Sequence, residues 1–244
     1  MALGIIGGTG LTRLDGLRID REEPVSTCWG EPSASLVHGR LGETEVVFLA
    51  RHGNPHRIPP HKVNYRANIK ALKEAGVERV VAVAAVGGIT ERASPSAVLI
   101  PDQIIDYTYG RSTTFFEDDL DDVVHIDFSW PYCAELRQSL LAAAQHARVP
   151  AIDGGVYAAT QGPRLETAAE IRKLAADGCD IVGMTGMPEA ALAREAGLCY
   201  ASLSVVANWG AGLSSDEITM ADIERELETG MSHVRRILET LLAG

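Results

Sequence analysis

The chain has 244 residues, a formal net charge of −11 and a pI near 5.1. That length suits one large α/β domain or two small ones, and a hydrophobic fraction of 46% is ample for a core. Aromatic residues make up only 5% of the chain, which together with the acidic balance argues against nucleic acids and anionic membranes as partners. A small anion such as phosphate remains possible, because it responds to the local field around its site.

Short β-rich apolar segments alternate with helical patterns along the chain. We therefore expect one α/β domain over residues 1–244, with a mixed, largely parallel central sheet flanked by helices. In the first half, Asn64 can cap a helix that runs to about Ala75 and is followed by Gly76. The segment RVVAVAAV, residues 79–86, is a continuous apolar run, as expected for a strand buried on both faces. Further strands are expected at residues 3–6, 35–37, 45–50 and within 98–107.

In the second half, residues 109–130 are polar, acidic and aromatic, which predicts a long loop of the kind that is usually functional or part of an interface. Helices are expected at residues 131–147, 166–176, 188–196 and 220–242. Strands are expected at residues 155–160, 180–184 and 198–207.

A glycine-rich turn, GIIGGTG at residues 4–10, directly follows the first expected strand. A dinucleotide-binding turn would need G-x-G-x-x-G, but counting from Gly8 places Arg13 where the third glycine belongs. Two interpretations remain open. The turn is either a cradle of backbone N–H groups for phosphate, with the Thr9 hydroxyl as an added donor, or a tight structural turn.

Residues 51–61, RHGNPHRIPPH, hold three histidines, two arginines and three prolines. Such a basic cluster in an acidic chain indicates an anion site, and arginine with a neighbouring histidine donor suits phosphate. The alternative is a solvated basic loop that only connects two elements.

The four cysteines, Cys28, Cys133, Cys179 and Cys199, are widely spaced and show no metal-binding pattern. We expect reduced, mostly buried thiols and hence a cytoplasmic protein. The N-terminus has no signal-peptide pattern, and no apolar stretch approaches the length of a membrane span.

Several segments in the same order along nearly the whole chain resemble the family of trimeric purine nucleoside and 5′-methylthioadenosine phosphorylases. They are GIIGGTGL (4–11), LARHG (49–53), KVNYRANIKALKEAGV (62–77), AAVGGI (84–89), TQGPRLETAAEIR (160–172) and DIVGMTGMPEAALAREAGLCYASLSVVAN (180–208). The first half is similar to the methylthioadenosine branch in particular.

The resemblance implies the nucleoside phosphorylase fold and phosphorolysis, in which inorganic phosphate attacks C1′ of a purine nucleoside and releases the base. Met184 would lie against the ribose, and Leu165, Trp209 and Gly210 would contribute to the nucleoside site. Phosphate would be a co-substrate, no metal or organic cofactor would be required, and the family implies a homotrimer. The residues implied to hold phosphate are Thr9, Arg51, His52, Ala84, Ala85 and Thr185.

Two catalytic positions, Glu166 and Asn208, depart from the methylthioadenosine branch, which has a small hydroxyl residue and an aspartate there. The 6-oxopurine phosphorylases have glutamate and asparagine, as this chain does. An asparagine amide donates to O6, and an ionised glutamate accepts from N1–H, so both positions favour a 6-oxopurine over adenine. The local alternatives are a first-turn helix residue for Glu166 and a strand-end turn residue for Asn208.

The substituent at C5′ depends on different residues. Ile218 and Met220 match the region that lines the 5′ pocket in the family, and methionine suits contact with a thioether. His56, and His125 from an adjacent subunit, are further candidates, while core packing is the alternative for the apolar pair. The expected substrate is S-methyl-5′-thioinosine. The alternatives are inosine or guanosine, methylthioadenosine, and, as a different class, non-catalytic nucleoside binding.

Overall fold

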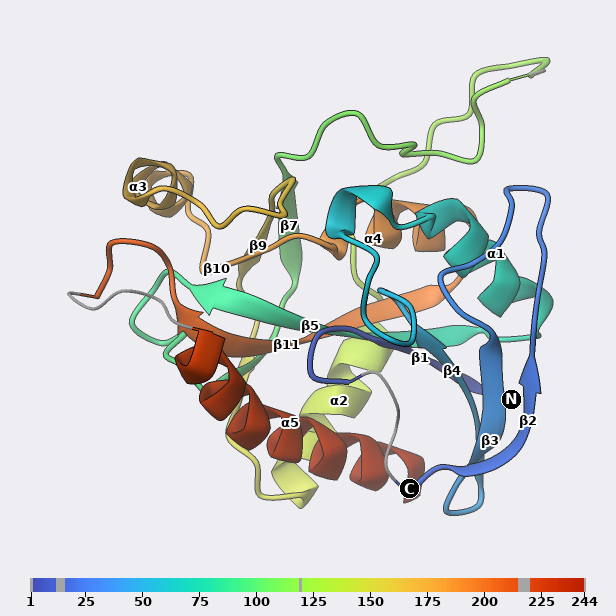
Figure 1. The fold of residues 1–244 in the computed structure, drawn as a ribbon, viewed down its shortest axis with the longest axis horizontal. Helices are drawn as coiled ribbons and strands as arrows, with labels where there is room; N and C mark the ends of the chain where they lie inside the picture. Colours follow the sequence, from blue (N-terminus) through green and yellow to red (C-terminus); the bar gives the residue numbers. More distant parts are fainter. Residues whose placement is uncertain (1, 12–15, 119, 215–219, 244) are drawn as a thin grey trace.

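A computed structural model of the protein describes residues 2–11, 16–118, 120–214 and 220–243 (Figure 1). Its centre is a sheet to which the described chain contributes eleven strands. They are β1 (Leu3–Gly7), β2 (Arg18–Glu23), β3 (Leu36–Leu41), β4 (Thr44–Ala50), β5 (Arg79–Gly88), β6 (Val98–Ile100), β7 (Gln103–Asp106), β8 (Ala151–Asp153), β9 (Val156–Ala159), β10 (Ile181–Gly183) and β11 (Cys199–Trp209).

The long apolar strand β5 lies in the middle of this sheet and pairs with β1, β10 and β11. Among the described strands, six of the ten pairings are parallel and four are antiparallel. The order across the main path is β2-β3-β4-β1-β5-β10-β9-β7, with β11, β6 and β8 branching from β5. The expected mixed, largely parallel sheet flanked by helices is therefore confirmed.

Helices cover both faces of the sheet (Figure 1). The helices α1 (Tyr65–Glu74) and α4 (Gly186–Glu195) pack on one face, whereas α2 (Ala134–His146) and α5 (Met220–Ala243) pack on the other. β5 serves both layers, because Val80 and Ala82 face α1 and α4 while Val81 and Val83 face α2 and α5. The remaining helical elements are α3 (Ala168–Ala176) and a short 3₁₀ turn, Pro60–Lys62. None of the described helices is long and apolar enough to cross a membrane.

Capping residues decide where the helices begin. Asn64 caps α1 as predicted, accepting a hydrogen bond from the backbone N–H of Ala67. The expected helix over residues 166–176 instead begins at Ala168, because Thr167 and Glu170 form a reciprocal capping box. Glu166 therefore lies before the helix and not in its first turn. α2 begins at Ala134, three residues later than expected, and its N-cap residue Cys133 makes no side-chain capping hydrogen bond.

Two strands were not predicted, and one predicted stretch forms two strands. The exposed, polar edge strand β2 and the short β8 were not expected, since neither shows an apolar alternation. The apolar stretch within 98–107 forms two strands, β6 and β7, because Pro101 interrupts it. In residues 109–130 the described part contains no helix or strand, as predicted.

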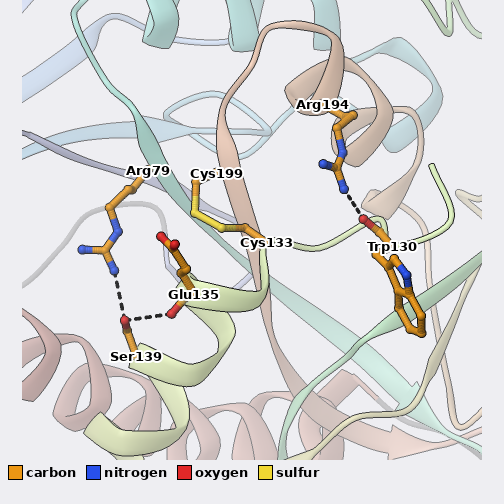
Figure 2. Close-up of a disulfide and its surroundings, with 7 residues drawn as sticks. All are labelled: Arg79, Trp130, Cys133, Glu135, Ser139, Arg194 and Cys199. Atoms are coloured by element: carbon orange, nitrogen blue, oxygen red, sulfur yellow. Dashed lines mark hydrogen bonds between the residues drawn. A yellow bond between two sulfur atoms is a disulfide. The ribbon is translucent and has the colours of Figure 1, made fainter. Parts of the chain in front are cut away.

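Cys133 and Cys199 form a disulfide between the residue that precedes α2 and the first residue of β11 (Figure 2). Their Cα atoms lie 5.1 Å apart, although 66 residues separate them along the chain. The expectation of reduced thiols is therefore wrong for this pair, because sequence spacing does not reveal that the fold brings these two positions together. Cys179 is a buried free thiol and Cys28 an exposed one.

Candidate active site

A cavity of about 310 Å³ opens at the carboxyl ends of the strands in the middle of the sheet. β1, β4, β5 and β11 are connected by parallel pairings, so their carboxyl ends meet at one edge, where ligands of α/β sheets usually bind. The cavity brings together twelve of the residues predicted for the site. They are Thr9, Arg51, His52, His56, Ala84, Ala85, Leu165, Glu166, Met184, Thr185, Asn208 and Gly210.

Four predicted residues are not brought to this cavity by the described structure. Trp209 is half-buried beside it but does not line it. His125 is exposed on the long loop and is absent from the cavity of its own chain. Ile218 and the side chain of Met220 lie outside the described residues. The apolar side chain that the structure does provide from α5 is Ile223, which lines the cavity.

Arg51 is the largest fully buried side chain of the site, at 1% exposure, and it forms a bidentate ion pair with Glu189. Its Nε lies 2.6 Å from Glu189 Oε2 and its Nη2 lies 2.9 Å from Oε1. Burial alone would lower the pKa of Arg51, but the carboxylate of Glu189 holds it well above its ordinary value. Arg51 is therefore permanently charged, and its charge is compensated within the protein.

The pair also fixes the direction of the guanidinium. Nη1 donates to the carbonyl oxygen of Val83 at 2.9 Å, and Tyr200 donates to Glu189 Oε1 at 2.8 Å. An arginine has five N–H groups, so within the described part of the chain one N–H on each terminal nitrogen is left for a ligand. Gly8 makes room for this arrangement, because a Cβ there would lie 2.8 Å from Arg51 Nη1.

His52 is buried, and its Nδ1 lies 2.8 Å from the carbonyl oxygen of Ile58. A carbonyl only accepts, so Nδ1 carries the hydrogen and Nε2 is an acceptor. Burial, and next the nearby Arg51 cation, lower the pKa of His52 to about 4. The ring is therefore neutral near pH 7 and stacks on His56, with 4.5 Å between centroids. His52 presents an acceptor toward a ligand, not the second donor that the sequence suggested.

We expect His52 to make the protein less stable in mild acid. The unfolded chain takes up a proton on this residue near pH 6.5, but the folded protein does so only near pH 4, so the free energy of unfolding falls as the pH drops through this window. The loss reaches up to about 3 kcal/mol, and His52→Asn removes it. Urea denaturation at several pH values measures it, with the exposed His125→Asn as control. An unchanged pH slope in His52→Asn would contradict the assignment.

Thr185 lines the same cavity as the glycine turn. It is buried and directly precedes α4, whose regular helical turns begin only after Met187, because that residue has an extended backbone. The Thr185 hydroxyl and the turn at Gly8 and Thr9 therefore bring neutral polar groups to the same cavity. Together with the ion-paired Arg51, these residues offer polar groups with little net charge.

The two base-reading candidates line the same cavity. Glu166 is half-buried, and its Oε1 accepts a hydrogen bond from the hydroxyl of Thr160 at 2.7 Å. Asn208 follows a bulge in β11, where the register with β5 shifts between Val206 and Asn208. Its Nδ2 donates to the carbonyl oxygen of Trp209 at 2.7 Å, which orients the amide and, among the described residues, leaves its oxygen and one N–H for a ligand.

Sequence reasoning missed the residues that hold the site in place, of which Glu189, Tyr200 and Thr160 are the clearest. Glu189 is completely buried in α4 among alanines and leucines. An acidic residue on an apolar helix face is a signal that the sequence carries, since such a group is almost never buried without a partner. Among the described residues, no group of three or more His, Cys, Asp or Glu side chains could hold a metal ion.

The fold is that of the nucleoside phosphorylases, and the chain belongs to the phosphorylase superfamily, whose family model matches residues 2–243. It is 56% identical over 239 residues to a probable S-methyl-5′-thioinosine phosphorylase of Pseudomonas syringae pv. tomato, covering 98% of this chain and 97% of the relative. It is 46% identical to the 6-oxopurine nucleoside phosphorylase of Pyrococcus furiosus, covering 91% of this chain and 84% of the relative. A solved structure of the methylthioadenosine phosphorylase of Schistosoma mansoni with adenine matches with a TM-score of 0.95 at 34% identity, over 100% of this chain and 91% of that one.

Proposed function

We propose that the protein catalyses the phosphorolysis of S-methyl-5′-thioinosine to hypoxanthine and 5-methylthioribose 1-phosphate. The observation that carries the proposal is the presence of Glu166 and Asn208 in the same cavity as Arg51 and Thr185. Reading of a 6-oxopurine at one end and binding of phosphate at the other require these two pairs to face one space. The names of the relatives, which include both methylthioinosine and 6-oxopurine phosphorylases, support this substrate class.

Phosphate would bind between the glycine turn and the start of α4. Arg51 would contribute its two remaining N–H groups, while Thr9, Thr185 and the backbone at Ala84 and Ala85 would add neutral contacts. His52 would accept a hydrogen bond from a protonated phosphate oxygen, because its free ring nitrogen carries no hydrogen. Donors that are already in place do not have to move when the bound phosphate reacts, so they stabilise the transition state without a cost of reorganisation.

The base would be read by complementary groups. Hypoxanthine presents O6 and N7 as acceptors and N1–H as a donor, whereas adenine presents an amino group and a bare N1. Asn208 would donate to O6 or N7, and Glu166 would accept from N1–H. A carboxylate facing the bare N1 of adenine would be repelled, so the same residue would also reject the amino purine.

Catalysis would follow from charges that develop as the C1′–N9 bond breaks. The ribose becomes positive, and the phosphate anion beneath it stabilises that charge before forming the new C1′–O bond. The departing purine becomes negative at N7 and O6, and the Asn208 amide stabilises it there. Holding phosphate against C1′ adds a proximity contribution of roughly 7 kcal/mol or more in favourable cases.

The methylthio group would occupy the apolar part of the cavity. Met184 and Ile223 line it, and Pro60 adds a further apolar surface. These side chains offer no hydrogen-bond partner to a 5′-hydroxyl, so the site favours the thioether of methylthioinosine over the hydroxyl of inosine. Inosine or guanosine remains the second candidate substrate, because the base contacts would be the same.

Product analysis tests the proposed reaction. Methylthioinosine incubated with the protein and phosphate should yield hypoxanthine and a sugar phosphate in equal amounts, and omission of phosphate should stop both. Hypoxanthine released without phosphate would instead make the protein a hydrolase, and binding without any product would make it a nucleoside-binding protein.

A homotrimer is also a proposal. The long loop carries large exposed side chains, including Tyr109, Val123 and Trp130 at 71%, 75% and 66% exposure, which is typical of a subunit contact. His125 on this loop would then reach the 5′ position of a neighbouring site. A cytoplasmic location stays a proposal as well, and the Cys133–Cys199 disulfide removes part of the argument on which it was based.

A further inference from the structure

Arg111 joins the two halves of the cavity without lining it. It lies in the long segment between β7 and α2, which passes above α4 in Figure 1. No sequence pattern singled it out, and it is half-buried. Each of its three guanidinium nitrogens nevertheless has a protein partner at 3.0 Å or less.

One group of these contacts holds the segment that leads to Glu166. Arg111 Nε donates to Gln161 Oε1 at 3.0 Å, and Nη2 donates to the carbonyl oxygens of Gln161 and Thr160 at 2.9 and 3.3 Å. The hydroxyl of Thr160 in turn donates to Glu166 at 2.7 Å. The guanidinium therefore contacts Thr160, the same residue whose hydroxyl orients the base-reading carboxylate.

The other group of contacts holds the segment around Thr185. Arg111 Nη1 donates to the carbonyl oxygens of Met184 and Met187, at 2.9 and 2.6 Å, on either side of Thr185. The two segments also touch directly, because a Cβ on Gly162 would lie 2.3 Å from Met184 Sδ. Both segments continue paired strands, β9 and β10, and beyond the last pair their relative position is set by close packing and by the guanidinium of Arg111.

We propose that Arg111 is a positioning residue that sets the distance between the base-reading and phosphate-binding parts of the site. The inference rests on the proposed function and deepens it. The planar guanidinium of arginine reaches carbonyl oxygens of both segments through different nitrogens, whereas a lysine has a single nitrogen. Since a misplacement of about 1 Å costs roughly 100-fold in rate, loss of this tie should slow the reaction without removing any group that touches substrate.

Arg66 provides a matched control. It anchors the same loop through Glu117 at 2.6 Å and packs over the ring of Trp29, but it contacts neither segment of the cavity. A variant at Arg66 therefore loosens the loop and removes an arginine while leaving the tie between the two segments intact.

The test compares wild type, Arg111→Ala, Arg111→Lys and Arg66→Ala at a temperature where thermal unfolding shows all four to be folded. Arg111→Ala should lower kcat roughly 10- to 100-fold and raise KM for both nucleoside and phosphate, because both segments lose their anchor. Arg111→Lys should recover only part of the rate. Added guanidinium, at a concentration that leaves wild type unaffected, should partly restore Arg111→Ala but not Arg66→Ala.

Several outcomes would overturn the inference: unchanged kinetics in Arg111→Ala, an effect on one substrate only, the same loss in Arg66→Ala, or no rescue by guanidinium. Wild type without phosphate-dependent purine release would refute the proposed function instead. In that case the role of Arg111 is tested by the thermal stabilisation that hypoxanthine and phosphate each give. If Arg111 positions both parts of the site, Arg111→Ala should weaken both responses.

Discussion

Replacement of Asn208 by aspartate is expected to shift the protein from 6-oxopurine toward 6-aminopurine nucleosides. The carboxylate accepts from the adenine amino group but repels the hypoxanthine O6, and it provides no N–H for the departing base. The ratio of kcat/KM for methylthioinosine over methylthioadenosine should fall roughly 100-fold in Asn208→Asp. The double variant Glu166→Ser with Asn208→Asp should prefer the adenine nucleoside, because it also removes the carboxylate that faces N1.

The ratio of two substrates is the informative readout here. Asn208 also donates to the carbonyl oxygen of Trp209, so Asn208→Asp disturbs the end of β11 whatever its role in recognition. Such a disturbance lowers both rates together and leaves their ratio in place. An unchanged ratio in Asn208→Asp would show that this residue does not read the base.

Removal of the Glu189 carboxylate should be the most destabilising single change in the site. Glu189→Gln leaves the fully buried Arg51 cation without its counter-charge, and breaking a buried ion pair costs about 3–5 kcal/mol. Phosphate should restore part of this loss, since the bound anion then compensates Arg51, so the variant should gain more thermal stability from phosphate than wild type does. Thermal unfolding with and without phosphate measures both effects.

A paired replacement separates stability from function. Arg51→Met with Glu189→Leu removes both charges and should recover most of the stability, as apolar replacement of a buried ion pair often does. The same double variant should still lack phosphate-dependent activity, because the N–H groups of Arg51 are gone. Full activity in it would place Arg51 outside the phosphate site.

The elements that the sequence predicted well are those with strong local signals. The apolar run of β5, the Asn64 cap and the glycine after α1 each act within a few residues, and the structure confirms them. The start of α3 was missed because two residues, Thr167 and Glu170, both fit a helix, and only their mutual hydrogen bonds define its first turn. The edge strand β2 has no apolar face to mark it.

For the site, the family resemblance was needed to collect residues from five segments into one cavity. What it did not reveal is how those residues are held. Glu189 compensates Arg51 from 138 residues away, and the Ile58 carbonyl turns His52 into an acceptor. The ion pair and this hydrogen bond both depend on tertiary contacts, so no local sequence pattern predicts them. The disulfide was missed for the same reason, because Cys133 and Cys199 meet only when α2 packs beside β11.

The most direct test of the account is purine release from methylthioinosine, methylthioadenosine and inosine, measured in parallel with and without phosphate. We expect methylthioinosine to be fastest by kcat/KM and all three reactions to require phosphate. If methylthioadenosine is fastest, the donor and acceptor assignments at Glu166 and Asn208 are wrong, although the phosphate site stands.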